Sequence, residues 1–343
     1  MKKFIFILFL VSCSSKYLKY EKEKQLVKNE EFERKVEIIS VDTAASSPVV
    51  EATKEPPVEQ KKAPIVKAKA KVKDKVTKKI ITPKKTQKRQ PDVEDRIGFE
   101  DGQRRPIKDP FAVGEKVIHE MSYFTAKAGL LTMEVKPMAQ VNQRRSYHFF
   151  VGLKSSGLFS NFYSVDDQVN TFLDYEELVP HVLKVSIKES GKLAQSQSYF
   201  DFQTNKASFW EKKYTEKSGE EERKFTWDIS PYSQNAFSGL YYMRIFEWKV
   251  GKEIAFQVAE DKKNIIFKGT AIAEETLETE AGEFKTIKIK ASILSRGALT
   301  QTGDVFLWIT NDDRKYIVRI EAKIKIGTIV SEVIEIKHGK TNQ

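Results

Sequence analysis

Two carboxylate pairs are the residues of this chain whose types and spacing come closest to a catalytic arrangement. Asp166-Asp167 and Asp312-Asp313 are adjacent in the sequence, and paired carboxylates can act as general acid and general base. Successive residues of a strand point to opposite faces of a sheet, so neither pair forms such a dyad unless the chain turns there. Asn311-Asp312-Asp313-Arg314 has the composition of a hairpin turn. Both pairs therefore favour a structural role.

The four histidines are scattered. They are His119, His148, His181 and His338, and they lack the close spacing of a typical metal motif. His119 alternates with Val117 and Met121, which predicts a structural histidine facing the interior or the rim of a sheet. The sequence has no Gly-x-Ser-x-Gly elbow, phosphate loop or His-Glu-x-x-His motif. We therefore expect no catalytic residue, metal or cofactor, and a protein that is not an enzyme.

The single cysteine, Cys13, offers a different chemistry. Lys2 and Lys3 precede an apolar run, Phe4 to Val11, and small Ser12 comes directly before the cysteine. A bilayer-spanning helix needs roughly 20 apolar residues, so this run is too short to cross. A charged start, a short apolar core and a small residue are typical of a secretory signal. The segment resembles a bacterial lipoprotein signal peptide, which would be cleaved between Ser12 and Cys13.

That resemblance implies acyl chains on Cys13 and a stable membrane anchor, because two or more chains hold a protein firmly. With one cysteine in the chain, an intramolecular disulfide is impossible. Ser14 and Ser15 follow the cysteine, with no aspartate. By analogy with enterobacterial sorting, this favours the outer membrane, with the protein facing the periplasm.

The net charge of +11 suggests a nucleic-acid binder at first sight, but its distribution does not. Residues 61–90 carry thirteen basic side chains and one acid, Asp74. Residues 1–60 carry ten of each sign, and residues 91–343 carry 36 basic and 37 acidic side chains. The excess therefore lies in one stretch without aromatic residues, which argues against nucleic-acid binding.

Residues 41–105 are rich in lysine and proline, and we expect a disordered tether there, because such a segment buries too little apolar surface to fold. As a coil it would span roughly 40–50 Å and carry a domain well away from its lipid anchor. The lysines are either a solvated spacer or a contact for anionic lipid or cell-wall polymers. The candidate residues for polyanion contact are Lys78, Lys79, Lys84, Lys85, Lys88 and Arg89.

Four regions follow from these patterns. Residues 1–12 are the signal peptide, residues 13–40 are a membrane-proximal segment with a marginal helix, and residues 41–105 are the tether. Residues 106–338 form a β domain, because β-branched and aromatic residues become frequent and alternation appears. In the clearest strand, Lys315 to Ile326, Tyr316, Val318 and Ile320 share one face and only Ile317 breaks the pattern.

One amphipathic helix accompanies these strands. Ser230 is expected as its N-cap, with Pro231 at the first helical position. Phe237, Leu240, Tyr241, Ile245 and Trp248 then form an apolar stripe, and Gly251 is the expected stop. The predicted fold is mainly β: a strongly curved antiparallel sheet, half-barrel or sandwich-like, with this helix packed against it.

Several short motifs in this domain resemble one bacterial family in their order and spacing. They are Gly114-Glu115, Ala128-Gly129-Leu130, Met133-Glu134-Val135, Ser238 to Arg244, Ala281 to Thr286, Trp308 to Arg314 and Val318 to Glu321. The resemblance is to DUF3108, a family of exported β-rich proteins of unknown function, and it covers most of residues 110–337. It implies a strongly curved sheet with a helix, and it implies no reaction.

The sequence thus predicts a lipid-anchored envelope protein that acts as a non-enzymatic binding or structural module. Its protein partner is not identified by the sequence. The alternative is a carrier or sensor of an apolar, lipid-like or glycan ligand inside the half-barrel, because aromatic residues cluster between Phe149 and Trp210. A packed aromatic core would count against the carrier, and an open apolar cavity would support it.

Overall fold

One antiparallel sheet contains every strand that the computed structural model describes. The described residues are 18, 22–41, 105–106, 108–124, 126–157, 159–295, 298–299, 304–324 and 327–340. The strand order is β10-β11-β12-β14-β15-β16-β2-β3-β4-β5-β6-β7-β8-β9, with β1 on β3 and β13 on β12. The mainly β fold predicted from the sequence is confirmed.

The strands are long, and most neighbours along the chain are joined as hairpins. Their bounds are β1 (Ile38–Ser40), β2 (Val113–Tyr123), β3 (Ala126–Val141), β4 (Arg144–Ser155), β5 (Asp166–Asp174), β6 (Pro180–Glu189), β7 (Lys192–Asp201), β8 (Lys206–Thr215), β9 (Gly219–Asp228), β10 (Glu253–Glu260), β11 (Lys263–Thr279), β12 (Gly282–Ser295), β13 (Ala298–Leu299), β14 (Val305–Thr310), β15 (Ile317–Ile324) and β16 (Gly327–Lys340). Two-residue turns with positive φ join β3 to β4 at Asn142-Gln143 and β10 to β11 at Asp261-Lys262, as the twist of hairpins favours.

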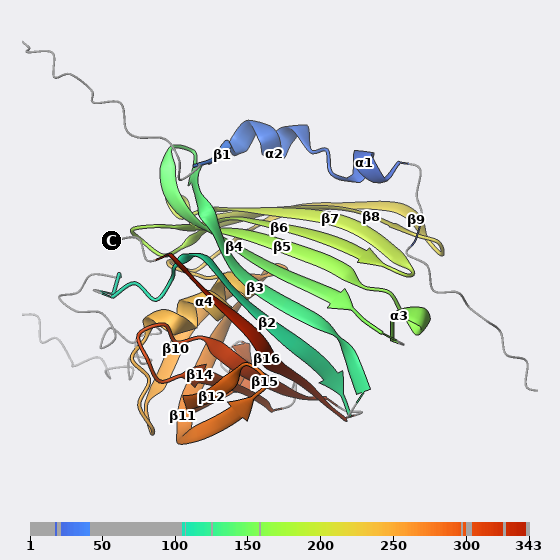
Figure 1. Ribbon diagram of the computed structural model, residues 1–343. Coiled ribbons are helices and arrows are strands. Elements are labelled where there is room, and N and C mark those ends of the chain that lie inside the picture. Colours follow the sequence, from blue (N-terminus) through green and yellow to red (C-terminus); the bar gives the residue numbers. More distant parts are fainter. Residues whose placement is uncertain are drawn as a thin grey trace, which may run out of the picture. The chain divides into compact units, whose positions relative to one another are not determined.

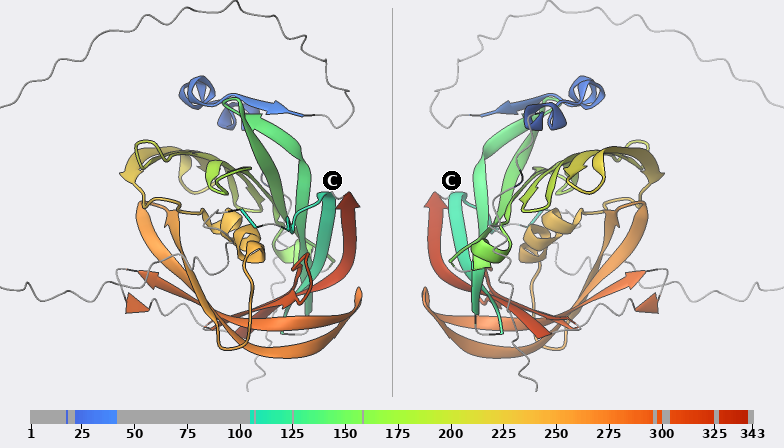
Figure 2. Two further views of the ribbon diagram at one scale, coloured as in Figure 1. Left: turned by 90° about the vertical axis from the view of Figure 1, so that its left-hand side faces the viewer. Right: turned by 90° about the vertical axis from the view of Figure 1, so that its right-hand side faces the viewer.

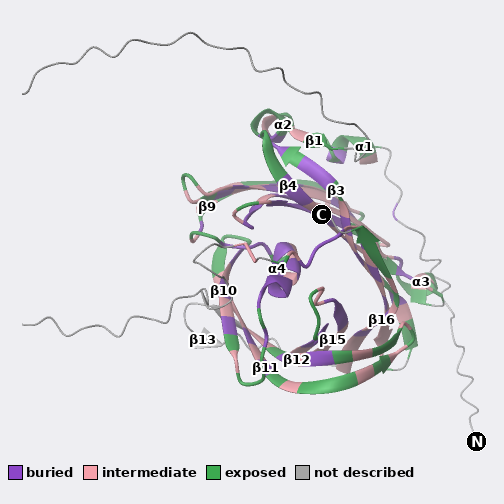
Figure 3. Ribbon diagram, turned by 60° about the vertical axis from the view of Figure 1, so that its left-hand side comes forward, coloured by how far each residue is buried: buried purple, intermediate pink, exposed green. Residues whose placement is uncertain are grey.

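The sheet rolls around a single central helix, as Figures 1 and 2 show. This helix, α4 (Ala236–Tyr242), continues into a 3-10 turn, η3 (Met243–Ile245). Its buried side chains reach several strands: Tyr241 stacks on Phe149 of β4 with ring centroids 4.0 Å apart, and Tyr242 meets Phe256 of β10 at 5.2 Å. The helix therefore lies within the curve of the sheet, where its residues are mostly buried (Figure 3).

Helix α4 begins later than the sequence suggested, so the prediction of Ser230 and Pro231 as its start is wrong. Asn235 is the N-cap, and its Oδ1 accepts from the backbone N–H groups of Phe237 and Ser238 at 3.0 and 2.8 Å. Ser238 completes a capping box by accepting from the N–H of Asn235. A fully satisfied cap outweighs a favourable proline upstream.

Strands β9 and β10 are the two edges of the sheet, and among the described residues no backbone ladder joins them. Side chains connect β9 to the β10–β11 hairpin instead. Asn264 Nδ2 donates to the carbonyl of Asp228 at 2.9 Å, and the Lys262 ammonium lies 4.3 Å from the centroid of the Phe225 ring. The roll is therefore held together at this seam by side chains and by α4, without closing into a barrel.

The described part of the N-terminal segment packs on the outer face of the sheet. It contains α1 (Glu23–Leu26), α2 (Glu30–Lys35) and β1. The remaining short helix, α3 (Phe159–Phe162), lies between β4 and β5. Strand β1 pairs with the end of β3 (Ser40 with Ala139). Phe32 and Val36 pack on Phe172 of β5 and Val182 of β6.

The opposite end of this segment is fixed near the turn between β6 and β7. Leu18 and Leu26 pack on Leu193 of β7, and the backbone N–H of Leu18 donates to the carbonyl of Glu189 at 3.4 Å. The chain from Leu18 to Val41 thus runs along the outside of the sheet from one end of its strands to the other (Figure 1). Five residue steps join Leu18 to Cys13, which lies outside the described residues.

Candidate functional site

The structure describes only some of the residues singled out from the sequence. Ser12, Cys13 and the six candidate polyanion contacts (Lys78, Lys79, Lys84, Lys85, Lys88 and Arg89) lie outside the described residues. Among the described residues, no group of histidine, cysteine and carboxylate side chains could hold a metal ion. In the same part of the chain, no helix is both long and apolar enough to span a membrane.

The two carboxylate pairs have different structural roles. Asp167 of β5 accepts from the backbone N–H of Lys188 at 3.0 Å, and burial raises the pKa of its carboxyl. Asp312 lies in the turn after β14, where its Oδ1 accepts from Thr310 Oγ1 and from the N–H groups of Arg314 and Lys315 at 2.8–2.9 Å. Asp312 thus stabilises a turn, as its sequence context predicted.

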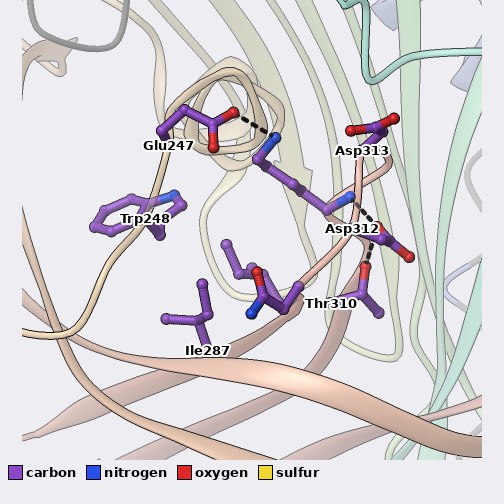
Figure 4. Close-up of a pocket in the computed structure, with 9 residues that line it drawn as sticks. Glu247, Trp248, Ile287, Thr310, Asp312 and Asp313 are labelled. Atoms are coloured by element: carbon purple, nitrogen blue, oxygen red, sulfur yellow. Dashed lines mark hydrogen bonds and ion pairs between the residues drawn. The ribbon is translucent and has the colours of Figure 1, made fainter.

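A polar pocket beside this turn is the clearest concave site (Figure 4). Its volume is about 170 Å³, and it is lined by Glu247, Trp248, Ile287, Ile309, Thr310, Asn311, Asp312, Asp313 and Lys315. The Lys315 ammonium crosses it to Glu247, with Nζ and Oε1 3.1 Å apart. Small-molecule sites usually hold roughly 300–1,000 Å³, so this pocket is small, and its lysine is already paired.

Directly connected to that turn is a buried ion pair between Arg244 of η3 and Glu115 of β2. Both side chains are almost fully excluded from solvent, at 2% and 1% exposed. Arg244 Nη2 donates to Glu115 Oε2 at 3.2 Å, to the carbonyl of Pro110 at 3.0 Å and to the carbonyl of Arg314 at 2.9 Å. Arg244 Nη1 and Nε are also bonded, to Glu115 Oε1 and to the Arg314 carbonyl.

This arrangement keeps Arg244 charged and fixed. Burial works to lower the pKa of Arg244, but the negative charge of Glu115 and the hydrogen bonds to it raise that pKa overall. Phe111 and Tyr316 flank the guanidinium, each with its ring centroid 5.2 Å from Cζ. A buried pair with every donor satisfied is suited to fixing geometry rather than to proton transfer. Arg244 therefore locks the central helix to β2 and to the β14–β15 turn.

A second polar cluster fixes the chain where it enters the β domain. Arg105 donates to Asp109, the Tyr147 hydroxyl and the Tyr175 carbonyl at 2.5, 2.7 and 2.6 Å. The guanidinium groups of Arg105 and Arg145 lie 3.6 and 4.1 Å from the centroid of the Tyr175 ring. Burial, with the nearby charge of Asp109, raises the pKa of the Tyr147 hydroxyl. Tyr147 is thus a neutral structural donor to Asp109 at physiological pH.

The four histidines serve separate local networks. His119 is fully buried inside the roll, as predicted, between the Ser331 hydroxyl (3.1 Å) and the Ile317 carbonyl (3.0 Å). Burial lowers its pKa to about 4. His181 contacts Asp174, His148 contacts Asn170 and His338 contacts Tyr316. The structure does not bring them together.

Sequence reasoning missed the pairing of Glu115 with Arg244, although a signal was present. Arg244 is a charged residue inside an otherwise apolar run, and each of the two residues belongs to one of the short motifs, Gly114-Glu115 or Ser238 to Arg244. A third motif, Trp308 to Arg314, supplies the carbonyl that Arg244 binds. The motifs therefore converge on one structural clamp.

The fold and this clamp define a class: an open antiparallel β roll locked around a central helix. The family model described as "Protein of unknown function (DUF3108)" matches residues 119–334. The chain therefore belongs to the DUF3108 family. No curated protein matches the sequence.

Several solved structures are similar to this chain at low identity. A β-barrel-like protein of domain of unknown function DUF1849 from Brucella abortus has 7% identity and a TM-score of 0.41, covering 66% of this chain and 98% of its own. A Bacteroides fragilis protein described as exported, with a YmcC-like fold, has 10% identity and a TM-score of 0.29, with 66% and 96% covered. A Parabacteroides distasonis protein described as a lipoprotein has 11% identity and a TM-score of 0.29, with 68% and 98% covered.

Proposed function

We propose that this protein is a lipid-anchored component of the bacterial cell envelope whose β domain is a non-enzymatic binding or structural module. The anchor is a set of acyl chains on Cys13, after cleavage of the signal peptide between Ser12 and Cys13. Lys2, Lys3, the apolar run Phe4 to Val11 and the small residue before the cysteine support this anchor. The proposed location is the outer membrane, facing the periplasm.

One observation carries the proposal: Leu18, five residues after Cys13, is part of the fold. Leu18 and Leu26 are buried against Leu193. The mature protein would therefore begin five residues before an element of its own domain, so the acyl chains would hold the roll close to the bilayer. A domain held this close is suited to acting at a surface.

The described residues on either side of the basic segment are both held by the β domain. The chain leaves the described domain at Val41, whose N–H donates to the Met138 carbonyl, and re-enters it at Arg105. Met138 in β3 and Tyr147 in β4 are both near the β3–β4 turn. The described chain on both sides of the basic segment is therefore attached to the domain. We propose that the lysines of residues 61–90 contact a polyanion, such as a cell-wall polymer.

The alternative of a carrier requires an open apolar interior. Tyr241 of α4 stacks on Phe149, and Phe111 meets both rings edge-on. Tyr242, Phe246 and Phe256 form a second aromatic group. These side chains fill the centre of the roll. The packing counts against a carrier with its ligand at this position and favours a module that acts through its surface.

Replacing Cys13 with serine tests the anchor. We expect the wild-type protein to enter the detergent-rich phase on phase separation and Cys13→Ser to remain in the aqueous phase. Ser14→Ala is the matched control, since it changes the adjacent residue and leaves the thiol. Equal partitioning of the wild type and Cys13→Ser would show that the thiol carries no lipid.

The binding role needs a separate experiment. Native mass spectrometry of the protein extracted from its own membranes should reveal a co-purifying protein or envelope polymer. Turnover of an envelope polymer by the purified protein would contradict the non-enzymatic proposal.

A further inference from the structure

Four exposed aromatic side chains gather at one end of the roll. Phe162 is 81% exposed and Phe124 is 70% exposed, and Phe159 and Tyr163 are each about 40% exposed. Phe124 lies in the β2–β3 turn, and the other three belong to α3 and the residue after it. We call these four residues the aromatic rim.

Hydrogen bonds place the parts of the rim at the same end of the sheet. The backbone N–H of Ser156, just before α3, donates to the carbonyl of Ala128 near the start of β3 at 3.1 Å. The Tyr163 hydroxyl donates to Glu189 Oε2 at the end of β6 at 2.7 Å. The tip of the β2–β3 hairpin and α3 therefore belong to the same end of the sheet, as Figure 1 also shows.

The N-terminal segment reaches the sheet at this same end. Leu18 bonds to the carbonyl of Glu189, the residue whose side chain contacts Tyr163. Lys188 Nζ lies 3.3 Å from Glu23 Oε1, which fixes α1 beside the same turn. Five residue steps of fully extended chain span at most about 18 Å. Cys13 is therefore within about 18 Å of Leu18 at this end of the sheet.

We propose that the aromatic rim lies in the headgroup layer of the membrane that holds the acyl chains. The inference rests on the proposed acylation of Cys13. Tyrosine and other amphipathic or large apolar side chains are favoured at the boundary between headgroups and acyl chains. The short stretch between Cys13 and Leu18 indicates that a bilayer contacts the aromatic rim, because an acylated Cys13 places the bilayer next to this end of the roll. The β3–β4 turn, Val41 and Arg105 then lie at the end that faces away from the membrane.

A fluorescence experiment on the full-length acylated protein tests this orientation. In Phe162→Cys the added thiol is the only free one, because acylation occupies Cys13. It is labelled with an environment-sensitive nitrobenzoxadiazole dye, and the protein is reconstituted into vesicles of phosphatidylethanolamine and phosphatidylglycerol. Gln203→Cys is the matched control, since Gln203 is exposed at the β7–β8 turn, roughly 30 Å along β7 from the Glu189 end.

We expect a blue-shifted emission at position 162 and several-fold stronger quenching by headgroup nitroxide lipids than at position 203. Equal quenching at the two positions in vesicles that carry the protein would overturn the proposed orientation. A blue shift that persists in detergent, rises with protein concentration and resists nitroxide lipids would assign the rim to a second copy of the chain instead.

Vesicle flotation separates this inference from the anchor on which it rests. The wild-type protein and both labelled variants should float with the vesicles. Wild-type protein that stays at the bottom of the gradient refutes acylation, and the orientation falls with it. Protein that floats but leaves position 162 in water refutes the orientation alone.

Discussion

Glu115 at the start of β2 binds both terminal nitrogens of Arg244, which lies in the 3-10 turn after the central helix. Both side chains are almost fully buried. The pair joins two segments far apart in sequence, and the carbonyls of Pro110 and Arg314 complete its hydrogen bonds. The helix inside the roll is therefore fixed by directional bonds as well as by apolar packing.

Arg244→Met should destabilise the protein severely. Removing one partner leaves the Glu115 carboxylate buried without its counter-charge, and such losses amount to about 3–5 kcal/mol. Urea unfolding followed by tryptophan fluorescence measures the change. Lys108→Met is the control, because Lys108 forms an exposed pair with Asp313 and should unfold like the wild type. A wild-type unfolding midpoint for Arg244→Met would mean that the pair is solvated.

Asn235→Ala should lower the free energy of unfolding by about 1–3 kcal/mol. Asn235 caps α4, and its Nδ2 also donates to Thr171 Oγ1 in β5 at 2.9 Å. Ser230→Ala is the matched control and should have a far smaller effect, since the helix does not begin there. Thermal unfolding of both variants distinguishes the two possible N-caps of α4. A larger loss of stability for Ser230→Ala than for Asn235→Ala would favour Ser230, the N-cap that the sequence suggested.

Stability should fall as the pH drops from about 6.5 to about 4. Burial lowers the pKa of His119 to about 4, against about 6.5 in an unfolded chain. Between these values the unfolded chain binds a proton that the folded chain does not, so this contribution is fully present above pH 6.5 and lost below it. The loss amounts to about 3 kcal/mol.

The variant His119→Gln isolates that contribution, because glutamine can bond to Ser331 and Ile317 without titrating. Urea midpoints measured across the same pH range should change less steeply for the variant. Parallel pH profiles for the variant and the wild type would rule out His119 as the source.

Phe32→Ala should release the N-terminal segment while the roll stays folded. Phe32 is buried in a small cluster on the outer face with Val36 and Phe172, and removing such a ring costs about 3–5 kcal/mol in a core. Limited proteolysis should then cut within residues 22–41, with the thermal transition of the roll preserved. Val27→Ala, at a side chain that is 50% exposed, should stay resistant. Equal resistance of both variants would contradict the docking.

Deleting residues 61–90 should leave the stability of the roll nearly unchanged. Both ends of the insertion are held by the domain, at Val41 and Arg105. Roughly halving a closed loop changes its closure free energy by only about 0.6 kcal/mol. Calorimetry of the full chain and the deletion variant measures this, and a large drop in Tm would show that the segment packs on the domain.

The sequence predicted the interior strands well because their alternation reflects one buried face. Ile317 is the exception in the predicted strand over residues 315–326. It pairs with Ile309 beside a bulge at Val318, because Trp308 pairs with Arg319, and this shift in register explains why Ile317 is buried despite its place in the pattern. Strand β9 was missed, since it begins Gly219-Glu220-Glu221-Glu222 and lacks apolar alternation. Charged residues on an edge strand discourage pairing with other chains. The same charged residues remove the alternation of apolar residues by which a strand is recognised in the sequence.

The clamp and the docked segment could not be predicted from local patterns. Both depend on contacts between residues distant in sequence, such as Arg244 with Glu115 and Phe32 with Val182. The sparse apolar residues between Leu18 and Ile39 indicated only a marginal helix, because their partners lie on three different strands. The short motifs indicated the fold, and three of them meet at the pair of Glu115 and Arg244.

The docking of residues 18–41 also decides what a single backbone cut between Val41 and Arg105 would do. The cut would divide the polypeptide into an N-terminal fragment and a β domain. These would remain associated through the pairing of β1 with β3, the apolar contacts of Phe32, Leu18 and Leu26, and polar contacts such as that of Glu23 with Lys188. With Cys13 acylated as proposed, a protease acting there would turn the covalent link between the β domain and its anchor into a reversible complex. The lifetime of that complex would be set by one three-residue strand, two small apolar clusters and the polar contacts beside them.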